Sequence, residues 1–542
     1  MGNIALGDAK ARSADVLGHV FEYFLGEFAL VEGKKGGQFY TPRSVVELLV
    51  EMLEPKKGRV FDPCCGSGGM FVQSAHFIEE HLKELPGSSV EDLYVYGQEK
   101  TEATVKLAKM NLAVNGLRGE ILEANTYHED PHNSFGKFDY VMANPPFNVD
   151  DVSLSAVEND RRFSTYGVPR NKTKLKKKDE GKATVPNANY LWINLFATSL
   201  KPEGRAALVM ANSASDARHS EADIRQRLIE ENLIYGMLTL PSNMFYTVTL
   251  PATLWFFDKA KKDRKILFID ARNIFRQIDR AHREFTPEQI SNIGMISQLH
   301  RGRRKKFVQL VDRYFEDGME KLTESQQDVG GIVEQLAAVL DDDAGKQAVS
   351  VLLKQWGRLK PLNKAYIAYE NSTVRKIDEQ NTAQHQLAKK FEPFFAELHA
   401  ELKQIDKTVR AHEKAKKTKG RRGDAETKAL KLALEKLHNL VKTAESFFLH
   451  IHWLQERFPA AKYEDVTGLC KLASPDEVAE KDYSLNPGRY VGVVIEEDGK
   501  TEEEFIQEIL EMNDELSDLN KQAKKLESTI SHNIKQIFWE SL

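Results

Sequence analysis

The sequence of 542 residues contains only three cysteines, Cys64, Cys65 and Cys470. Cys64 and Cys65 are adjacent and therefore poor disulfide partners, and no set of cysteines and histidines has the spacing of a zinc site. We therefore expect no metal site. The scarcity of cysteine also indicates a reducing compartment, which is the cytoplasm.

Long apolar runs are absent as well. The apolar stretch at residues 252–257 is much shorter than the roughly 20 residues that a membrane-spanning helix needs, so it is interpreted as a strand. There is no recognisable signal peptide, and Leu6 stands where a myristoylation motif at Gly2 requires Ser or Thr. These absences predict a soluble cytoplasmic protein without a membrane partner.

Neither sign of charge is in large excess. Lys and Arg total 76 against 81 Asp and Glu, which gives a net charge of −5. A nucleic-acid-binding role would therefore have to depend on local basic patches. The hydrophobic share of 41% is ordinary for a protein with a sizeable core, and the length predicts more than one structural unit.

Strand and helix patterns alternate between residues 56 and 300, which favours a mostly parallel, Rossmann-like α/β sheet with helices on both faces. The last two strands are joined by a connection too short for a crossover helix, so we expect an antiparallel β-hairpin at one edge of the sheet. The expected strands are 59–62, 93–98, a short strand near 121, 138–142, 206–210, 233–240 and 253–257.

Beyond residue 300 the sequence becomes rich in Lys, Glu, Gln, Ala and Leu, which predicts a mainly helical region with a solvated loop at 412–426. The expected organisation is N-terminal helices at 1–55, an α/β catalytic domain at 56–300, a helical insert at 301–445, a small mixed unit at 446–500 and a C-terminal helix at 501–542.

The last helix has apolar residues at alternating spacings of four and three, which is the seam of a coiled coil. Such a helix can bind a partner, form a homodimer or pack within the chain, and we favour partner docking. The seam residues are Phe505, Ile509, Met512, Leu516, Leu519, Ala523, Leu526 and Ile530.

Two features suggest a ligand at the carboxyl ends of the first strands. Asp62 ends the first strand, and the turn at residues 66–69 (GSGG) then leads into a helix without the spacing of a dinucleotide or Walker motif. Glu99 ends the second strand, where a carboxylate can accept two hydrogen bonds from a ribose diol. Each feature also has a structural interpretation, as a tight turn and as a carboxylate at a helix N-terminus.

The segment NPPF at residues 144–147 directly follows another expected strand. Its two prolines make the turn rigid and would present the Asn144 amide and the Pro145 carbonyl as acceptors beside the Phe147 ring. These groups suit a planar amine attached to an aromatic ring. A purely structural turn is the alternative. The segment GQFYTP at 37–42 is either part of a site or a helix cap.

Together, GQFYTP, DPCCGSGG, GQE and NPPF, in this order, resemble the S-adenosylmethionine-dependent DNA amino-methyltransferases, and most of all the modification (M) subunit of type I restriction–modification systems. The resemblance is close over about residues 13–300 and looser at NPGRYV and the terminal helix. Such subunits usually begin with a larger helical domain, which is almost absent here. The resemblance implies a methyltransferase fold. It also implies that the protein transfers a methyl group to adenine N6 in duplex DNA, with the target base extruded from the stack.

The resemblance assigns residues 38–43 and 66–69 to the methionine part of S-adenosylmethionine, Asp62 to its amino group and Glu99 to its ribose. Asn125 stands where the family often has an Asp that contacts the cofactor adenine. The cofactor residues implied are Gln38, Phe39, Tyr40, Thr41, Pro42, Arg43, Asp62, Gly66, Ser67, Gly68, Gly69, Glu99 and Asn125. The catalytic residues implied are Asn144, Pro145, Pro146 and Phe147.

Residues 161–182 hold nine Lys or Arg against two acids and are interpreted as a basic loop that contacts DNA phosphates. No separate base-reading domain is evident, so the expected partners are a DNA-specificity (S) subunit, docked on the coiled coil, and possibly a restriction (R) subunit. Cytosine N4 methylation and a non-catalytic assembly role are the alternative functions. The expected DNA contacts are Arg161, Arg162, Arg170, Lys172, Lys174, Lys176, Lys177 and Lys178.

Overall fold

The structure is a computed structural model of the whole chain. The chain divides into two compact units, Met1–Gly492 and Val493–Leu542. The residues that the structure describes are 41–80, 92–170, 183–245, 251–280, 282–340, 342–372, 376–418, 425–494 and, in part, 513–530.

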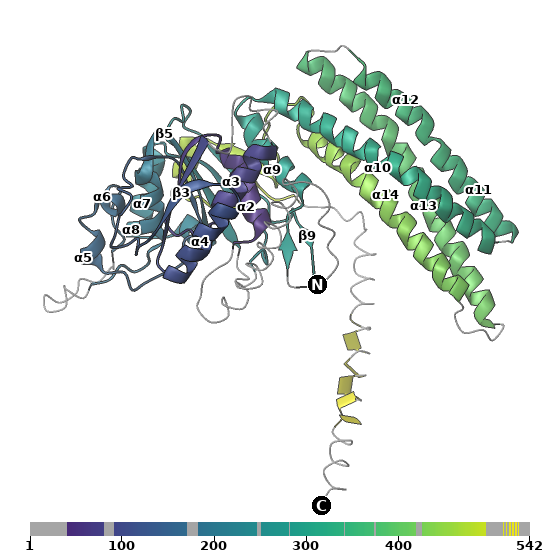
Figure 1. Cartoon of the computed structure of the whole chain (residues 1–542), viewed down its shortest axis with the longest axis horizontal. Helices are drawn as coiled ribbons and strands as arrows, with labels where there is room; N and C mark the ends of the chain where they lie inside the picture. Colours follow the sequence, from purple (N-terminus) through teal and green to yellow (C-terminus); the bar gives the residue numbers. More distant parts are fainter. Residues whose placement is uncertain are drawn as a thin grey trace, which may run out of the picture. The chain divides into compact units, whose positions relative to one another are not determined.

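The described part of the first unit is built on a nine-stranded sheet, in the order β11-β8-β6-β7-β5-β4-β1-β2-β3 (Figure 1). The chain adds β2 and β3 on one side of β1 and then β4 on its other side, so the direction of winding reverses beside β1. This confirms the predicted Rossmann-like sheet, and it creates the crevice in which such sheets bind ligands. The strands are β1 (Gly58–Asp62), β2 (Leu93–Glu99), β3 (Arg118–Glu123), β4 (Phe138–Ala143), β5 (Leu200–Ala211), β6 (Ile234–Thr239), β7 (Ala252–Asp258), β8 (Ile266–Asp270) and β11 (Cys470–Ala473).

Helices cover both faces of the sheet, as predicted. Alternate side chains of each strand enter opposite cores: Val60 and Met142 belong to one core, and their neighbours Phe61 and Val141 belong to the other. The first core is covered by α2 (Arg43–Leu53), α3 (Gly69–Glu80), α4 (Glu102–Val114) and α9 (Pro287–His300). The second is covered by α7 (Asn189–Ser199) and α8 (Ser220–Glu230).

The predicted antiparallel pair is present as β6 and β7, but it does not form the edge of the sheet. The sheet continues from β6 through the parallel strand β8 to the antiparallel strand β11. β11 comes from the segment expected to form a separate mixed unit at 446–500. In the same segment the Tyr490 ring stacks on Phe268 of β8 with centroids 3.8 Å apart. This segment therefore completes the α/β core.

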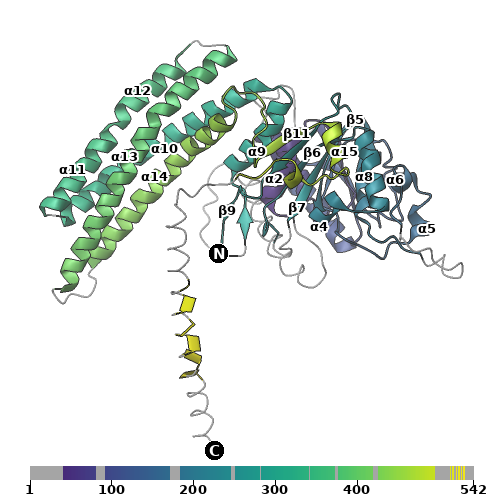
Figure 2. The same cartoon turned by 180° about the vertical axis from the view of Figure 1, so that it is seen from behind.

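The predicted helical region after residue 300 consists of long helices that pack side by side (Figure 2). Phe391 and Phe448 stack within it with ring centroids 4.4 Å apart, which joins its fourth helix to its fifth. The last helix continues through the boundary predicted at 445, and the expected loop at 412–426 is helical as far as Thr418. The helices are α10 (Arg304–Val339), α11 (Asp343–Gly357), α12 (Leu359–Glu370), α13 (Ile377–Thr418) and α14 (Ala425–Arg457). Among the described residues, no helix combines the length and apolar composition that a membrane span requires.

The second unit is described at Val493 and Val494 and, beyond them, at scattered helical residues between 513 and 530. Three of the predicted seam residues, Leu516, Leu526 and Ile530, are 57%, 63% and 57% exposed. Phe505, Ile509, Met512 and Leu519 lie outside the described residues. The coiled coil therefore stays a prediction.

A buried ion-pair cluster joins the α/β domain to α10. Glu54, at the C-terminal end of α2, is only 2% exposed and receives charged hydrogen bonds from Arg303 and from Lys306, the latter at 2.9 Å. Burial by itself raises the pKa of Glu54, but the two cations outweigh burial and lower this pKa from 4.5 to about 2. The carboxylate is thus ionised at neutral pH and compensates two cations at the junction.

We expect Glu54→Gln to lower the free energy of unfolding by about 3 kcal/mol at pH 7, because it leaves Arg303 and Lys306 without their carboxylate. Since the folded pKa lies below the unfolded value, the wild-type contribution is complete above about pH 5 and is lost as the pH falls towards 2. Denaturant unfolding at several pH values measures both effects. Glu102→Gln, which breaks the exposed pair with Lys106, is the control and should change little. An acid dependence that is the same in Glu54→Gln and wild type would contradict the assignment.

Candidate active site

The glycine turn after β1 lies at the winding reversal of the sheet. Gly66 and Gly68 have φ values of +51° and +84°, a region that favours glycine. A Cβ on Gly66 or Gly69 would meet no atom of the described residues within 4 Å, whereas a Cβ on Gly68 would lie 3.3 Å from Leu112. Gly68 therefore serves close packing with α4, and Gly66 and Gly69 leave the backbone open to a ligand.

Asp62 lies beneath this turn and is 2% exposed. Its Oδ1 accepts a hydrogen bond from the Cys64 backbone N–H at 2.9 Å. Burial raises the pKa of Asp62 to about 8; the Cys64 hydrogen bond opposes this rise, and the charge of Glu99 adds to it. A buried carboxyl group with such a pKa is poised to ionise when a cation binds beside it.

Glu99 faces the glycine turn from the end of β2. Its Oε2 accepts from the Gly66 N–H at 3.2 Å, and its Oε1 accepts from the Thr101 N–H at 3.1 Å. Each carboxylate oxygen keeps a second lone pair, so the group can still accept hydrogen bonds from a diol. The structure thus brings Glu99 and the glycine turn together, as the sequence predicted.

Asn144 follows β4, across the winding reversal from Asp62. Its Nδ2 donates to Thr41 Oγ1 at 3.0 Å, which fixes the orientation of the amide. Its Oδ1 is buried and has no hydrogen-bond partner among the described residues. A buried carbonyl oxygen without a donor is costly, so this acceptor is available for the N–H of a ligand.

A second asparagine cluster holds the loop after NPPF. The backbone N–H of Asn148 donates to Asn189 Oδ1 at 2.9 Å, and Asn148 Oδ1 accepts from the amides of Asn187 and Asn189 at 3.1 and 3.0 Å. Sequence reasoning missed these residues because Asn187 and Asn189 lie about 40 positions further along the chain. The repeated Asn-x-Asn at the start of α7 was the available signal.

The loop after β3, residues 124–137, carries Asn125. The Asn125 Oδ1 accepts from the Tyr127 N–H at 3.2 Å, so the carbonyl end is used within the loop and a ligand would meet the NH2 end. The same loop is fixed to β1 by Thr126 Oγ1, which donates to the Pro63 carbonyl at 2.6 Å.

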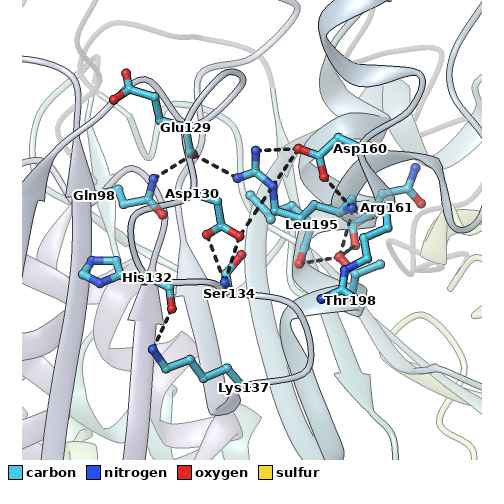
Figure 3. A network of polar contacts seen from close by, with 12 residues as sticks. Gln98, Glu129, Asp130, His132, Ser134, Lys137, Asp160, Arg161, Leu195 and Thr198 are labelled. Atoms are coloured by element: carbon cyan, nitrogen blue, oxygen red, sulfur yellow. Dashed lines mark hydrogen bonds and ion pairs between the residues drawn. The ribbon is translucent and has the colours of Figure 1, made fainter.

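Arg162 supports this loop through a network of polar contacts, in which Figure 3 labels Glu129, Asp130 and Asp160. Its guanidinium donates to the Glu129 carbonyl at 3.0 Å and to Asp160 at 2.7 Å, and it lies 3.8 Å from Asp130. Its side chain is only 4% exposed. The prediction that Arg162 contacts DNA is therefore wrong: an arginine this buried and this fully paired supports the loop.

The other predicted DNA contacts fall into two groups. The Arg161 guanidinium lies 4.1 Å from the centroid of the Phe135 ring, and Arg170 is exposed and pairs with Glu158 at 3.3 Å. The second group, which lies outside the described residues, comprises Lys172, Lys174, Lys176, Lys177 and Lys178.

The segment GQFYTP is described only from Thr41 onward, so Gln38, Phe39 and Tyr40 lie outside the described residues. Pro42 occupies the N-cap position of α2, and Arg43 pairs with Glu47 at 2.7 Å. Thr41 contacts Asn144 through the hydrogen bond given above. No side-chain hydrogen bond caps this helix, so the helix-cap interpretation is not supported, while Thr41 contacts Asn144 in the candidate site.

No cluster of metal-binding side chains occurs in the part of the chain that the structure describes. Cys65 is buried, and burial raises the pKa of its thiol, so the group stays protonated. The candidate site consists instead of backbone, carboxylate and amide groups that surround the winding reversal of the sheet.

Comparison with known proteins identifies the family of this chain. The type I restriction enzyme MjaIX methylase subunit of Methanocaldococcus jannaschii is 42% identical over 288 residues, which cover 52% of this chain and 48% of the relative. The HindI methylase subunit of Haemophilus influenzae is 39% identical over 283 residues, which cover 52% and 59%. The chain thus spans about half the length of the curated relatives it matches.

Among solved structures, the methyltransferase subunit of the type I restriction-modification system of Streptococcus thermophilus is 26% identical, with a TM-score of 0.46 over 54% of this chain and 59% of that chain. Residues 12–314 match the family model described as N-6 DNA methylase, a span that exceeds half of the sequence. The chain therefore belongs to the N-6 DNA methylase family.

Proposed function

We propose that this protein transfers a methyl group from S-adenosylmethionine to the N6 atom of adenine in duplex DNA, as the modification subunit of a type I restriction–modification complex. The observation that carries the proposal is the buried Oδ1 of Asn144 at the carboxyl end of β4, which has no hydrogen-bond partner in the part of the chain that the structure describes. It lies across the winding reversal from Asp62 and Glu99, and the family match supports the same chemistry.

The residues present fit S-adenosylmethionine. Gly66 and Gly69 leave open space above the backbone, where the methionine part would lie, and Asp62 supplies a carboxylate for its ammonium group. Glu99 would accept hydrogen bonds from the ribose hydroxyls. The NH2 end of Asn125 would donate to a ring nitrogen of the cofactor adenine. This hydrogen bond would replace the contact that the family often makes through an Asp at this position.

The chain's own residues would act on the target amine. S-adenosylmethionine, when bound, supplies an electrophilic methyl group. Asn144 Oδ1 and the Pro145 carbonyl would accept hydrogen bonds from the two N6 protons, which favours the pyramidal nitrogen of the transition state over the planar ground state. Pro146 keeps the turn rigid, and Phe147 would stack on the base. The methylated nitrogen becomes acidic and releases its proton to solvent, so no general base is required.

The target base has to leave the DNA stack to reach this crevice. We infer that phosphate contacts on either side come from Arg161, from Arg170 and from the lysines of residues 172–178. Arg170 is exposed, and its hydrogen bond to Glu158 is long, at 3.3 Å. A DNA phosphate could therefore replace Glu158 as its partner.

We infer a specificity subunit as the partner of the C-terminal helix, and a restriction subunit as a further partner. Three helical seam residues are more than half exposed, which supports an apolar seam that can pack against a helix of another protein. They are Leu516, Leu526 and Ile530. The curated relatives are named as methylase subunits of type I restriction enzymes, which supports an assembly of this kind.

The function is tested by expressing the chain with a specificity subunit in a host that lacks adenine methylation, and sequencing the DNA for N6-methyladenine. We expect methylation at one recurrent site. Asn144→Ala should reduce methyl transfer by about 100-fold or more, because it removes a preorganised acceptor at the reacting amine. Cofactor affinity, measured by calorimetry, should stay near the wild-type value.

Asn439→Ala, an exposed asparagine of α14, is the matched control and should methylate as wild type does. Thr41→Val should give a smaller loss, about tenfold, because the amide stays but its orienting partner is removed. Methyl groups on cytosine N4, or full activity in Asn144→Ala, would overturn the proposal.

Cofactor binding should release a proton from Asp62. In the free protein its pKa is about 8, so the carboxyl group is mostly protonated at pH 7, and a cationic ligand favours the carboxylate. Affinity should therefore rise by up to about tenfold per pH unit between pH 6 and 7.5. Calorimetry at pH 7 in buffers of different ionisation enthalpy should detect nearly one proton released per cofactor bound.

Asp62→Asn should abolish this proton release, whereas Asp139→Asn, at the opposite end of the sheet, should keep it. Proton release that is unchanged in Asp62→Asn would show that another group titrates.

A further inference from the structure

A small basic hairpin lies between β8 and α9. Its strands are β9 (Arg276–Gln277) and β10 (Arg283–Glu284), and Figure 2 shows β9 extending away from the sheet. β8 runs parallel to β6, and β6 runs in the same direction as β5, β4 and β1, since β7 is antiparallel to both β5 and β6. The hairpin therefore leaves the sheet at the edge where β1 and β4 end, which is the edge of the candidate active site.

The base of the hairpin is tied to the element that positions Asn144. The backbone N–H of Phe285 donates to Ser44 Oγ at 3.3 Å, in the first turn of α2. Thr41, three residues before Ser44, accepts the hydrogen bond that orients Asn144. The hairpin and the acceptor for the target amine thus share one anchor.

The hairpin is braced on its other side as well. The Arg283 N–H donates to the Asn243 carbonyl at 3.0 Å, and its guanidinium donates to Ser242 Oγ at 3.1 Å and stacks on the Phe275 ring at 3.9 Å. Arg276 pairs with Glu284 across the two strands. These contacts brace the base of the hairpin, and the His282 backbone N–H closes its tip by donating to Asp279 Oδ1 at 2.9 Å.

The tip presents an apolar side chain between arginines. Ile278 is 52% exposed, and the side chain of Arg276 is 59% exposed although it is paired. Arg280 is exposed as well. Arginines flanking a projecting aliphatic side chain are the composition of elements that enter DNA, where the cations contact phosphates and the apolar group packs against a disrupted base stack.

We propose that the β9–β10 hairpin contacts duplex DNA beside the target adenine. Arg276 and Arg280 bind phosphates, and Ile278 packs against the base pairs that lose a stacking partner when the target base is extruded. The inference rests on the proposed methylation of DNA and adds to it the element that stabilises the opened duplex. Charge supports DNA as the partner: residues 272–284 contain four arginines against two acids. Arg272 pairs with Asp270 and Arg276 with Glu284, so Arg280 contributes most of the positive charge at the tip.

The experiment uses the full chain in complex with its specificity subunit and a duplex that carries the mapped methylation site. Arg280→Ala should weaken DNA binding three- to tenfold and lower the slope of log affinity against log salt by about 1, as expected for one lost phosphate contact. Ile278→Ala should lower the methylation rate about tenfold and reduce the emission of 2-aminopurine placed at the target position, because fewer bases are extruded.

The Ile278→Ala defect should disappear on a duplex with an abasic site opposite the target, where the stack is already weakened. Cofactor affinity should not change in either variant. The matched controls are Arg118→Ala, at the start of β3 on the opposite edge, and Ile367→Ala, an isoleucine of α12 that is 47% exposed. Both controls should bind and methylate DNA as wild type does.

Variants that match their controls in salt slope and 2-aminopurine emission would overturn the proposal. Loss of the specificity subunit from either variant would also overturn it, since the hairpin would then be a protein interface. If the wild-type complex binds duplex DNA but methylates nothing, the proposed function fails, and the salt slope of Arg280→Ala on the same DNA still decides whether the hairpin contacts phosphates.

Discussion

The reversal of winding between β1 and β4 is the constraint on which the site depends. Because β2 follows on one side of β1 and β5 lies on the far side of β4, the segments that leave β1 and β4 turn in different directions, and such a reversal leaves a crevice at the carboxyl ends of the strands. Asp62, Glu99 and Asn144 reach the crevice only because each terminates one of three adjacent strands. Every element that we connect with DNA, including the β9–β10 hairpin, leaves the sheet at this same edge.

The sequence allowed β1 to β7 and the polar residues at three strand ends to be predicted, because these features depend on local order, whereas β8 and β11 were not predicted. An apolar run followed by Asp62, by Glu99 or by Asn144 identifies a strand and the group at its end without knowledge of distant contacts. The partners could not be predicted in the same way. Glu54 and Arg303 are 249 positions apart, and nothing in either segment identifies the other. The joining of β11 to β8 is equally non-local, so the final segment looked like a separate unit.

Charge shows the same distinction between sequence and surface. Four cations of the basic run at 301–306 form ion pairs within the fold. Arg301 pairs with Asp258 at 3.3 Å, Arg304 with Asp378, and Arg303 and Lys306 with Glu54. Arg162 is likewise buried among acceptors. A run of arginines therefore reports a surface field only when its acidic partners are absent, and partners far along the chain are invisible to local reasoning.

Several buried polar atoms in the described residues have no partner, among them the indole nitrogens of Trp192 and Trp255, so an unpaired atom by itself does not identify a site. Location separates Asn144 from these. Both tryptophans belong to the apolar core on one face of the sheet, whereas Asn144 stands at the end of β4, with its amide already fixed by Thr41. Folding gains nothing from an oriented carbonyl that accepts no hydrogen bond, and the burial of Asp62 similarly opposes the ionised form of its carboxyl group. Two such costs at one strand edge are expected where a fold keeps groups ready for a ligand at the expense of stability.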